Sequence, residues 1–214
     1  MKKIIVITAL TIVIITTGIS LTAQNHDNMS KSELTNSKAY YLKTNMRKLW
    51  EDHVVWTRNV ILGIVNELPG YDEAVKRLLE NQDEIGNSIK PYYGEVAGNK
   101  LAELLRIHVN ISADVVKAAN TFNIKGLDES NKLWIANADE ISAFLSKINI
   151  HWKPEEMKQM MRDHLLLTTA EALARIKRDY KADVIAYDAV HNDILEMADM
   201  LSDGIIKQFP DMFN

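Results

Sequence analysis

Apolar residues recur every three or four positions along nearly the whole chain after residue 36, and they alternate nowhere over a useful length. The first spacing puts side chains on one face of a helix, whereas a half-buried strand needs strict alternation. All 4 Pro fall between these periodic segments, where they end one helix or start the next. The sequence therefore predicts an all-α fold without a sheet.

The breaks divide the chain into about six predicted helices, packed as an antiparallel bundle. The first four are expected at 37–68, at 72–90, from the turn at 91–94 to about 120, and at 128–148. Pro154 starts a further segment that contains no other Pro before residue 210. One helix of that length is unusual in a compact domain, so we place a break near 180–183.

A pattern of residues returns along the chain at intervals of 55 or 56 positions. Asn81-Gln82-Asp83-Glu84-Ile85 resembles Asn137-Ala138-Asp139-Glu140-Ile141, and Asp193 and Glu196 fit a third copy. Three histidines follow the same interval, each with a hydroxyl residue four positions later: His53 with Thr57, His108 with Ser112, and His164 with Thr168. These matches predict three copies of one helical hairpin.

The first 23 residues are typical of a signal peptide. Lys2 and Lys3 precede an apolar run at 4–21, and the small residue Ala23 marks the expected cleavage position. An uncleaved membrane anchor is the alternative, because an apolar run of 18 residues is just long enough to span a bilayer. Residues 24–35 are polar and predict a flexible tether, which leaves 36–214 as a single domain. We therefore expect an exported protein, located in the periplasm, the envelope or the medium.

Charge and cysteine content exclude several classes of function. Loss of the N-terminal segment removes 2 Lys and no acidic residue, which takes the net charge from −4 to −6. A nucleic-acid partner would need a basic face, so none is expected. With 0 Cys, the sequence excludes disulfides, thiolate zinc sites and cysteine nucleophiles. Contact with a membrane is expected only through an uncleaved N-terminal segment, and the sequence indicates no particular protein partner or oligomer.

Four histidines lie, one per predicted helix, within apolar stripes that should be buried. They are His53, His108, His164 and His191, and Glu171 and Asp188 accompany them on the same faces. Asp188 and His191 are one turn apart, a spacing that metal sites in helical bundles use. Neutral imidazoles and carboxylates suit iron, zinc or manganese. The sequence thus indicates a site for a transition metal or a metal cofactor, formed by these six residues.

Other interpretations of these residues stay open. Each histidine can be structural, bonded to a backbone carbonyl or a hydroxyl, because an unpaired buried polar group costs about 1–3 kcal/mol. The paired Glu-x-x-His motifs of ferritin-like metal sites do not occur in the sequence. Met157, Met160 and Met161 share a helix face with His164, a combination that suits copper(I), although core packing is the commoner role of Met.

Four stretches of the chain carry a resemblance to a known family. They are Leu49 to Arg58 (LWEDHVVWTR), Asn81 to Gly94 (NQDEIGNSIKPYYG), His164 to Thr169 (HLLLTT) and Gly204 to Pro210 (GIIKQFP). Together they resemble a family of small exported bacterial all-helical proteins of unassigned activity, over nearly the whole chain after the signal segment. The resemblance implies an exported helical bundle and supplies no functional residues. A looser likeness to ferritin-like bundles concerns the fold alone.

Two classes of function follow from these observations. The first is an exported helical bundle that binds a transition metal or a metal cofactor through its core histidines. The second is a non-enzymatic binding or interaction domain of the envelope, in which the histidines are structural. The sequence contains no Gly-rich phosphate loop and no Ser nucleophile motif, so nothing indicates an enzyme of those kinds.

Overall fold

A computed structural model describes residues 31–214, with side chains from residue 37 onward. Within this range the chain forms six helices and no strand, which confirms the predicted all-α class. The helices are α1 (Lys31–Asn66), α2 (Tyr71–Asn120), α3 (Ile124–Ile148), α4 (Pro154–Ile176), α5 (Tyr180–Gln208) and α6 (Pro210–Phe213). The predicted signal segment and most of the predicted tether lie outside the described residues.

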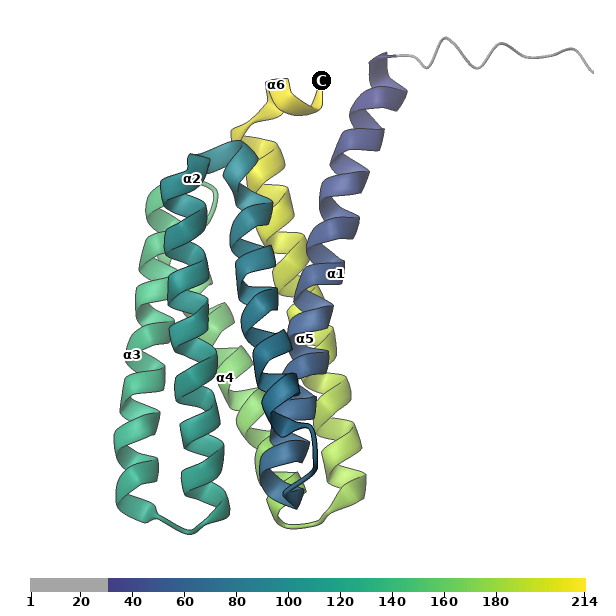
Figure 1. Cartoon of the computed structure of the whole chain (residues 1–214). Coiled ribbons are helices and arrows are strands. Elements are labelled where there is room, and N and C mark those ends of the chain that lie inside the picture. The colour runs from purple at the N-terminus through teal and green to yellow at the C-terminus, as the bar shows by residue number, and fades with distance from the viewer. Residues whose placement is uncertain (1–30) are drawn as a thin grey trace, which may run out of the picture.

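The longest helix, α2, consists of two helical segments that fold back beside each other (Figure 1). Gly94 separates them with φ 82° and ψ 170°, a backbone conformation that is essentially restricted to glycine. The two segments approach closely at Gly86 and Gly98, where a Cβ on Gly86 would lie 2.5 Å from the Gly98 carbonyl oxygen. The predicted turn at 91–94 is therefore present, with a helix on each side of it.

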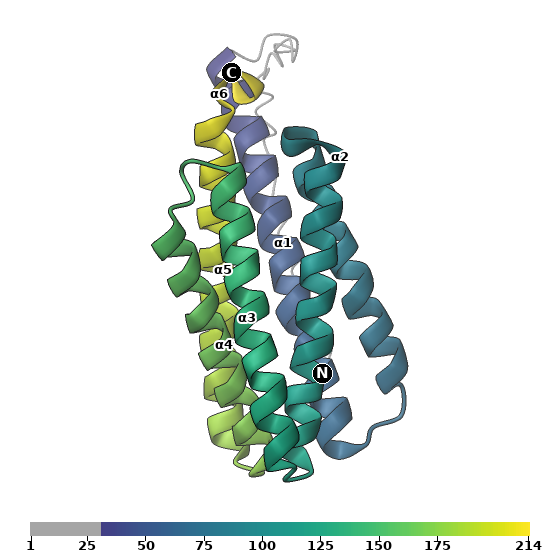
Figure 2. The same ribbon diagram turned by 90° about the vertical axis from the view of Figure 1, so that its left-hand side faces the viewer.

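Successive long segments run up and down the bundle and are joined by short turns (Figure 1, Figure 2). α1 packs against α2 and α5, α3 lies between α2 and α4, and α4 pairs with α5. The start of α1 and the short α6 lie at the same end of the bundle (Figure 1). Among residues 31–214, no helix combines the length and the apolar character needed to cross a membrane.

Some helix ends differ from the predicted positions. α3 begins at Ile124 rather than after Asp128, because the Asn123 side chain caps it and accepts a hydrogen bond from the Gly126 backbone N–H at 3.1 Å. α1 begins at Lys31, inside the predicted tether, since no Pro or Gly separates these residues from the rest of the helix. The break before α5 falls at 177–179, close to the predicted one.

Aromatic residues of the predicted turns cover the end of the bundle that carries α6. Trp152 is only 1% exposed. The Tyr93 hydroxyl accepts a hydrogen bond from Asn149 Nδ2 at 2.7 Å, and Tyr92 stacks on Phe213 with ring centroids 5.7 Å apart. These contacts join the kink of α2 to the α3–α4 turn and to the C-terminus, so this end of the bundle is closed by side chains.

Candidate functional site

Three of the four candidate histidines meet in the middle of the bundle. His53 in α1, His108 in α2 and His164 in α4 are each only 3–4% exposed. His164 lies between the other two: its ring centroid is 5.8 Å from that of His53 and 6.3 Å from that of His108. We call these three residues the histidine layer. The inward-facing stripes of three helices therefore bring the three residues to one depth of the bundle.

His108 is fully hydrogen-bonded in its neutral form. Its Nε2 accepts a hydrogen bond from the indole N–H of Trp134 at 3.0 Å, so the ring proton must be on Nδ1. Nδ1 donates that proton to the side-chain oxygen of Asn137 at 2.8 Å. Burial lowers the pKa of His108 to about 4, against the opposing effect of Asn137. The ring is thus neutral at pH 7, and both of its nitrogens are occupied.

The other two members of the histidine layer are also neutral but less well paired. Burial, and secondarily His108, lowers the pKa of His53 to about 3, and burial likewise lowers the pKa of His164 well below its usual value. Within residues 31–214, the Nδ1 atoms of His53 and His164 have no hydrogen-bond partner. The nearest carboxylate is Asp193, whose Oδ2 is 3.8 Å from His164 Nδ1 and whose pKa burial raises to about 6.

Matching contacts surround the histidine layer at the predicted repeat interval. Asn81 Nδ2 donates to the Leu49 carbonyl at 3.0 Å, and Asn137 Nδ2 donates to the Leu104 carbonyl at 3.2 Å. Each carbonyl belongs to the residue four positions before a layer histidine. Asp193, the third member of that series, faces His164 as Asn137 faces His108. The asparagines thus join neighbouring helices, which is the structural role that is commonest for buried amides.

The remaining candidate metal ligands lie elsewhere. His191 is on the flank of α5, where its Nε2 is 3.0 Å from Glu51 Oε1, because Val190 and Ile194 occupy the inward face of that helix. Asp188 is exposed. Glu171 is buried but pairs with an arginine. The structure therefore brings together three of the six predicted residues and separates the other three from them.

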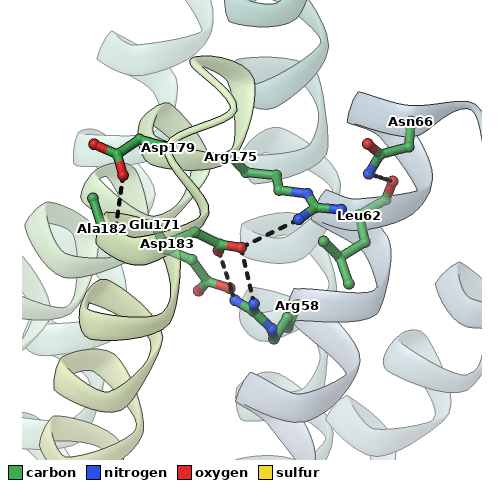
Figure 3. A network of polar contacts seen from close by, with 8 residues as sticks. All are labelled: Arg58, Leu62, Asn66, Glu171, Arg175, Asp179, Ala182 and Asp183. Carbon is green, nitrogen blue, oxygen red and sulfur yellow. Dashed lines mark hydrogen bonds and ion pairs between the residues drawn. The ribbon is translucent and has the colours of Figure 1, made fainter.

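Glu171 belongs to a buried ion-pair network that links α1, α4 and α5 (Figure 3). Arg58 Nη1 is 2.6 Å from Glu171 Oε1, and its guanidinium also bonds both oxygens of Asp183, at 2.9 and 3.1 Å. Arg175 approaches Asp183 at 3.4 Å, and the Tyr187 ring lies against Arg58 at 4.5 Å. We call Arg58, Glu171 and Asp183 the buried ion cluster. Burial raises the pKa of Glu171 to about 7 even though Arg58 acts in the opposite direction.

A pocket of about 340 Å³ lies directly beyond the histidine layer, between α1, α2, α3 and α4. Its walls are mainly aliphatic, with Val60, Ile61, Val116, Leu127, Ala172 and Leu173 among them. Thr57, Ser112 and Thr168 form its inner end, one helical turn after His53, His108 and His164 respectively. It extends along the bundle axis to the α2–α3 and α4–α5 turns, where Ile124 and Ile176 line it.

The geometry of the histidine layer differs from that of a metal centre. Histidines on one zinc ion hold their nitrogens about 2.0–2.1 Å from it, which brings ring centroids to roughly 5 Å from one another. The two adjacent pairs here are farther apart, at 5.8 and 6.3 Å, and both nitrogens of His108 are already bonded. Across residues 31–214, no group of three or more His, Asp or Glu is arranged to hold a metal ion.

The sequence predicted that the three layer histidines face the interior of the bundle. It did not predict the ion pair between Arg58 and Asp183 or the pocket. No spacing connects Arg58 with Asp183, because the two side chains come from α1 and α5 and meet only when the helices pack. The pocket arises where small side chains such as Ala172 face one another, and its space depends on the distances between helices. The one available signal was the series of hydroxyl residues four positions after the histidines, which form the inner end of the pocket.

The family resemblance inferred from the four sequence stretches stays a prediction, and the chemistry of the site rests on its own geometry. Comparison of the chain with protein-family models, with curated proteins and with solved structures found no match.

Proposed function

We propose that this protein is an exported, non-enzymatic binding domain that holds one small, mainly apolar molecule in the pocket between α1, α2, α3 and α4. The observation that carries the proposal is the pocket itself. Its volume of about 340 Å³ falls in the range of about 300–1,000 Å³ that is typical of small-molecule sites. Such sites are lined mainly by apolar side chains with a few polar groups, as this one is.

The histidine layer has a structural role in this proposal. His108 joins α2 to α3 through Trp134 and Asn137, and all three imidazoles are held neutral by burial. A neutral polar layer can be buried at low cost where its hydrogen bonds are made. It separates the pocket from the closed end of the bundle and, through the residues one turn away, positions the hydroxyls at the inner end of the pocket.

Metal binding by the histidine layer has less support. The unpartnered Nδ1 atoms of His53 and His164, with Asp193 nearby, are the groups that favour it. His108 counts against it, since binding a metal would break its bonds to Trp134 or Asn137. His191 pairs with Glu51, Glu171 pairs with Arg58, and Asp188 is exposed, so none of the three joins the layer. We therefore rank the apolar pocket above the metal site.

Binding can be tested with the neutral apolar dye N-phenylnaphthylamine, whose fluorescence rises in a dry environment. We expect the wild-type protein to bind one dye per chain. Phe in place of Ala172, which lines the pocket, should weaken binding about tenfold or more by filling the space. Phe in place of Ala170, which is exposed on the same helix, is the matched control and should leave binding unchanged.

A second pocket variant keeps the test valid if the first variant fails to fold. Ala172 is only 6% exposed, so Ala172→Phe is accepted only with an unchanged helical circular dichroism spectrum. Ala119→Phe fills the pocket from the less buried end of α2 and should weaken dye binding in the same way. The proposal fails if wild-type protein does not bind the dye, or if both folded pocket variants bind it as tightly as Ala170→Phe.

Export is the part of the proposal that rests on the amino-acid sequence alone. Lys2, Lys3 and the apolar run at 4–21 indicate a signal peptide that is cleaved after Ala23. Mass spectrometry of the protein isolated from its native envelope or medium should therefore find an N-terminus near Gln24. An intact Met1 in a soluble cytoplasmic pool would reject export without affecting the proposal for the pocket.

A further inference from the structure

The pocket is elongated along the bundle axis. On α4 it is lined from Thr168 to Ile176, and on α3 from Ile124 to Trp134. At 1.5 Å per residue, these stretches correspond to about 12–15 Å, roughly the length of a chain of eight to ten carbons. The outer end carries exposed apolar side chains, since Ile124 is 72% and Leu173 is 40% exposed. A straight, narrow molecule fits this space better than a compact one.

The inner end offers two hydroxyls that the protein itself does not use. Ser112 and Thr169 donate to backbone carbonyls of their own helices, at 2.8 and 2.7 Å. In contrast, the buried Oγ1 atoms of Thr57 and Thr168 have no hydrogen-bond partner within residues 31–214. Thr in a helix divides between two χ1 rotamers, so each hydroxyl can turn toward the pocket. Because Thr168 is only 4% exposed, a polar ligand atom at this end would meet it without competition from bulk water.

The electrostatics of the lining exclude a charged group at the inner end. No Lys or Arg is among the lining residues, and the imidazoles behind the hydroxyls are neutral. Arg58, the nearest buried cation of α1, already bonds Glu171 and Asp183. The one acidic lining residue, Asp128, is exposed and paired with Lys132 at 2.6 Å. A buried ligand charge would therefore lose its hydration without gaining a partner.

Building on the proposed function, on which this step rests, we infer that the occupant is an uncharged, elongated molecule with one hydroxyl or carbonyl group, which hydrogen-bonds Thr57 and Thr168. A straight-chain alcohol of medium length represents this class. The corresponding fatty acid, ionised at neutral pH, has the same shape but carries the charge that the inner end cannot pair. Head-group charge is therefore the property that the site should discriminate most strongly.

The inference is tested by displacement of bound N-phenylnaphthylamine with decanol, decanoate and decane at about pH 8, where the free acid is ionised. We expect decanol to displace the dye at a concentration about tenfold or more below that of decanoate. Thr168→Val should weaken the binding of decanol about threefold to tenfold and leave the binding of decane unchanged. Thr121→Val is the matched control, because Thr121 is exposed outside the pocket lining and its hydroxyl bonds the Lys117 carbonyl at 2.9 Å, and it should change neither.

Failure of this inference can be told apart from failure of the proposed function. If the dye does not bind the wild-type protein, the pocket function itself is wrong. If the dye binds and decanoate displaces it as well as decanol does, the pocket stands and the inference that it selects uncharged ligands is wrong. Equal effects of Thr168→Val and Thr121→Val on the concentration of decanol that displaces the dye would overturn the role of the Thr168 hydroxyl.

Discussion

Replacement of Arg58 by Met is expected to lower the free energy of unfolding by about 3–5 kcal/mol at about pH 8. Arg58 is the cation that pairs the carboxylates of Glu171 and Asp183, whose side chains are only 2% and 3% exposed. Removal of one member of a buried ion pair leaves the other charge without hydration and without a partner. Here Glu171 would lose its cation, whereas Asp183 would keep only the longer contact to Arg175 at 3.4 Å. Denaturant unfolding of both proteins at equal pH measures the difference.

Two further variants separate this cause from a simple loss of packing. Lys48→Met breaks the exposed pair with Asp52, at 2.7 Å, and should cost less than about 1 kcal/mol. Adding Glu171→Gln and Asp183→Asn to Arg58→Met removes the unpaired charges and should restore part of the lost stability. A lower pH should also reduce the loss of stability in Arg58→Met, because protonation of Glu171 removes its unpaired charge. An unfolding midpoint for Arg58→Met within error of wild type would show that the buried ion cluster contributes nothing.

Acidification from pH 7 to pH 5 is expected to destabilise the wild-type protein by about 2 kcal/mol. The three layer histidines have folded pKa values of about 3, about 4 and well below 6.5, whereas the unfolded value is 6.5. Their stabilising contribution is therefore complete above pH 6.5 and is lost as pH falls toward the folded pKa values. By pH 5, His53 and His108 should each cost about 2 kcal/mol, and His164 should add a cost of the same sign.

Two buried carboxyls act in the opposite direction. The pKa of Glu171 rises from 4.5 to about 7 and that of Asp193 from 3.8 to about 6 on folding. The folded state thus binds these protons more tightly than the unfolded state, which stabilises it as pH falls. Together they should offset about 3–4 kcal/mol of the histidine effect at pH 5. The net loss is smaller than the histidines alone would cause, but it keeps the same sign.

Asp193→Asn provides the control for this pH dependence. The variant removes a carboxylate whose pKa is raised by burial, so at about pH 8, where that carboxylate is charged in the wild type, it should be more stable than wild type. It also lacks the carboxyl that opposes the histidines, so its loss between pH 7 and pH 5 should be larger by about 1 kcal/mol. Denaturant midpoints at several pH values measure both effects. A wild-type midpoint that does not change between pH 7.5 and pH 5 would contradict the neutral, buried state of the histidine layer.

The sequence was most informative about features that depend on one helix at a time. The periodic stripes and the positions of Pro predicted the helices and the inward direction of His53, His108 and His164, and the structure has both. Whether inward histidines meet depends on the depth of each helix in the bundle, which stripes do not specify. The start of α3 was misplaced because Asn123 and Asp128 are both good caps, and only the observed Asn123–Gly126 bond distinguishes them.

The features that sequence reasoning missed depend on several helices together. His191 lies within an apolar stripe of the sequence, as the layer histidines do, yet in the structure Val190 and Ile194 occupy the inward face of α5 instead. Arg58 sits next to a stripe and would ordinarily be solvated. It is half-buried instead, because Glu171 and Asp183 from two other helices pair with it. The pocket has no sequence motif at all, since it is the space that small residues leave when four helices pack.

The position of the pocket along the bundle determines how the protein presents it to its surroundings. The chain enters the bundle at the start of α1, at the end that carries α6 (Figure 1). The pocket is lined by Ile124 and Ile176, which lie next to the α2–α3 and α4–α5 turns, so it lies toward the opposite end. From Lys31 to Thr57 at the inner end of the pocket, α1 rises about 40 Å. A membrane attachment at the N-terminus would thus join the bundle at the end opposite the pocket mouth. A tethered form and a released form would therefore sample ligand from the same aqueous phase.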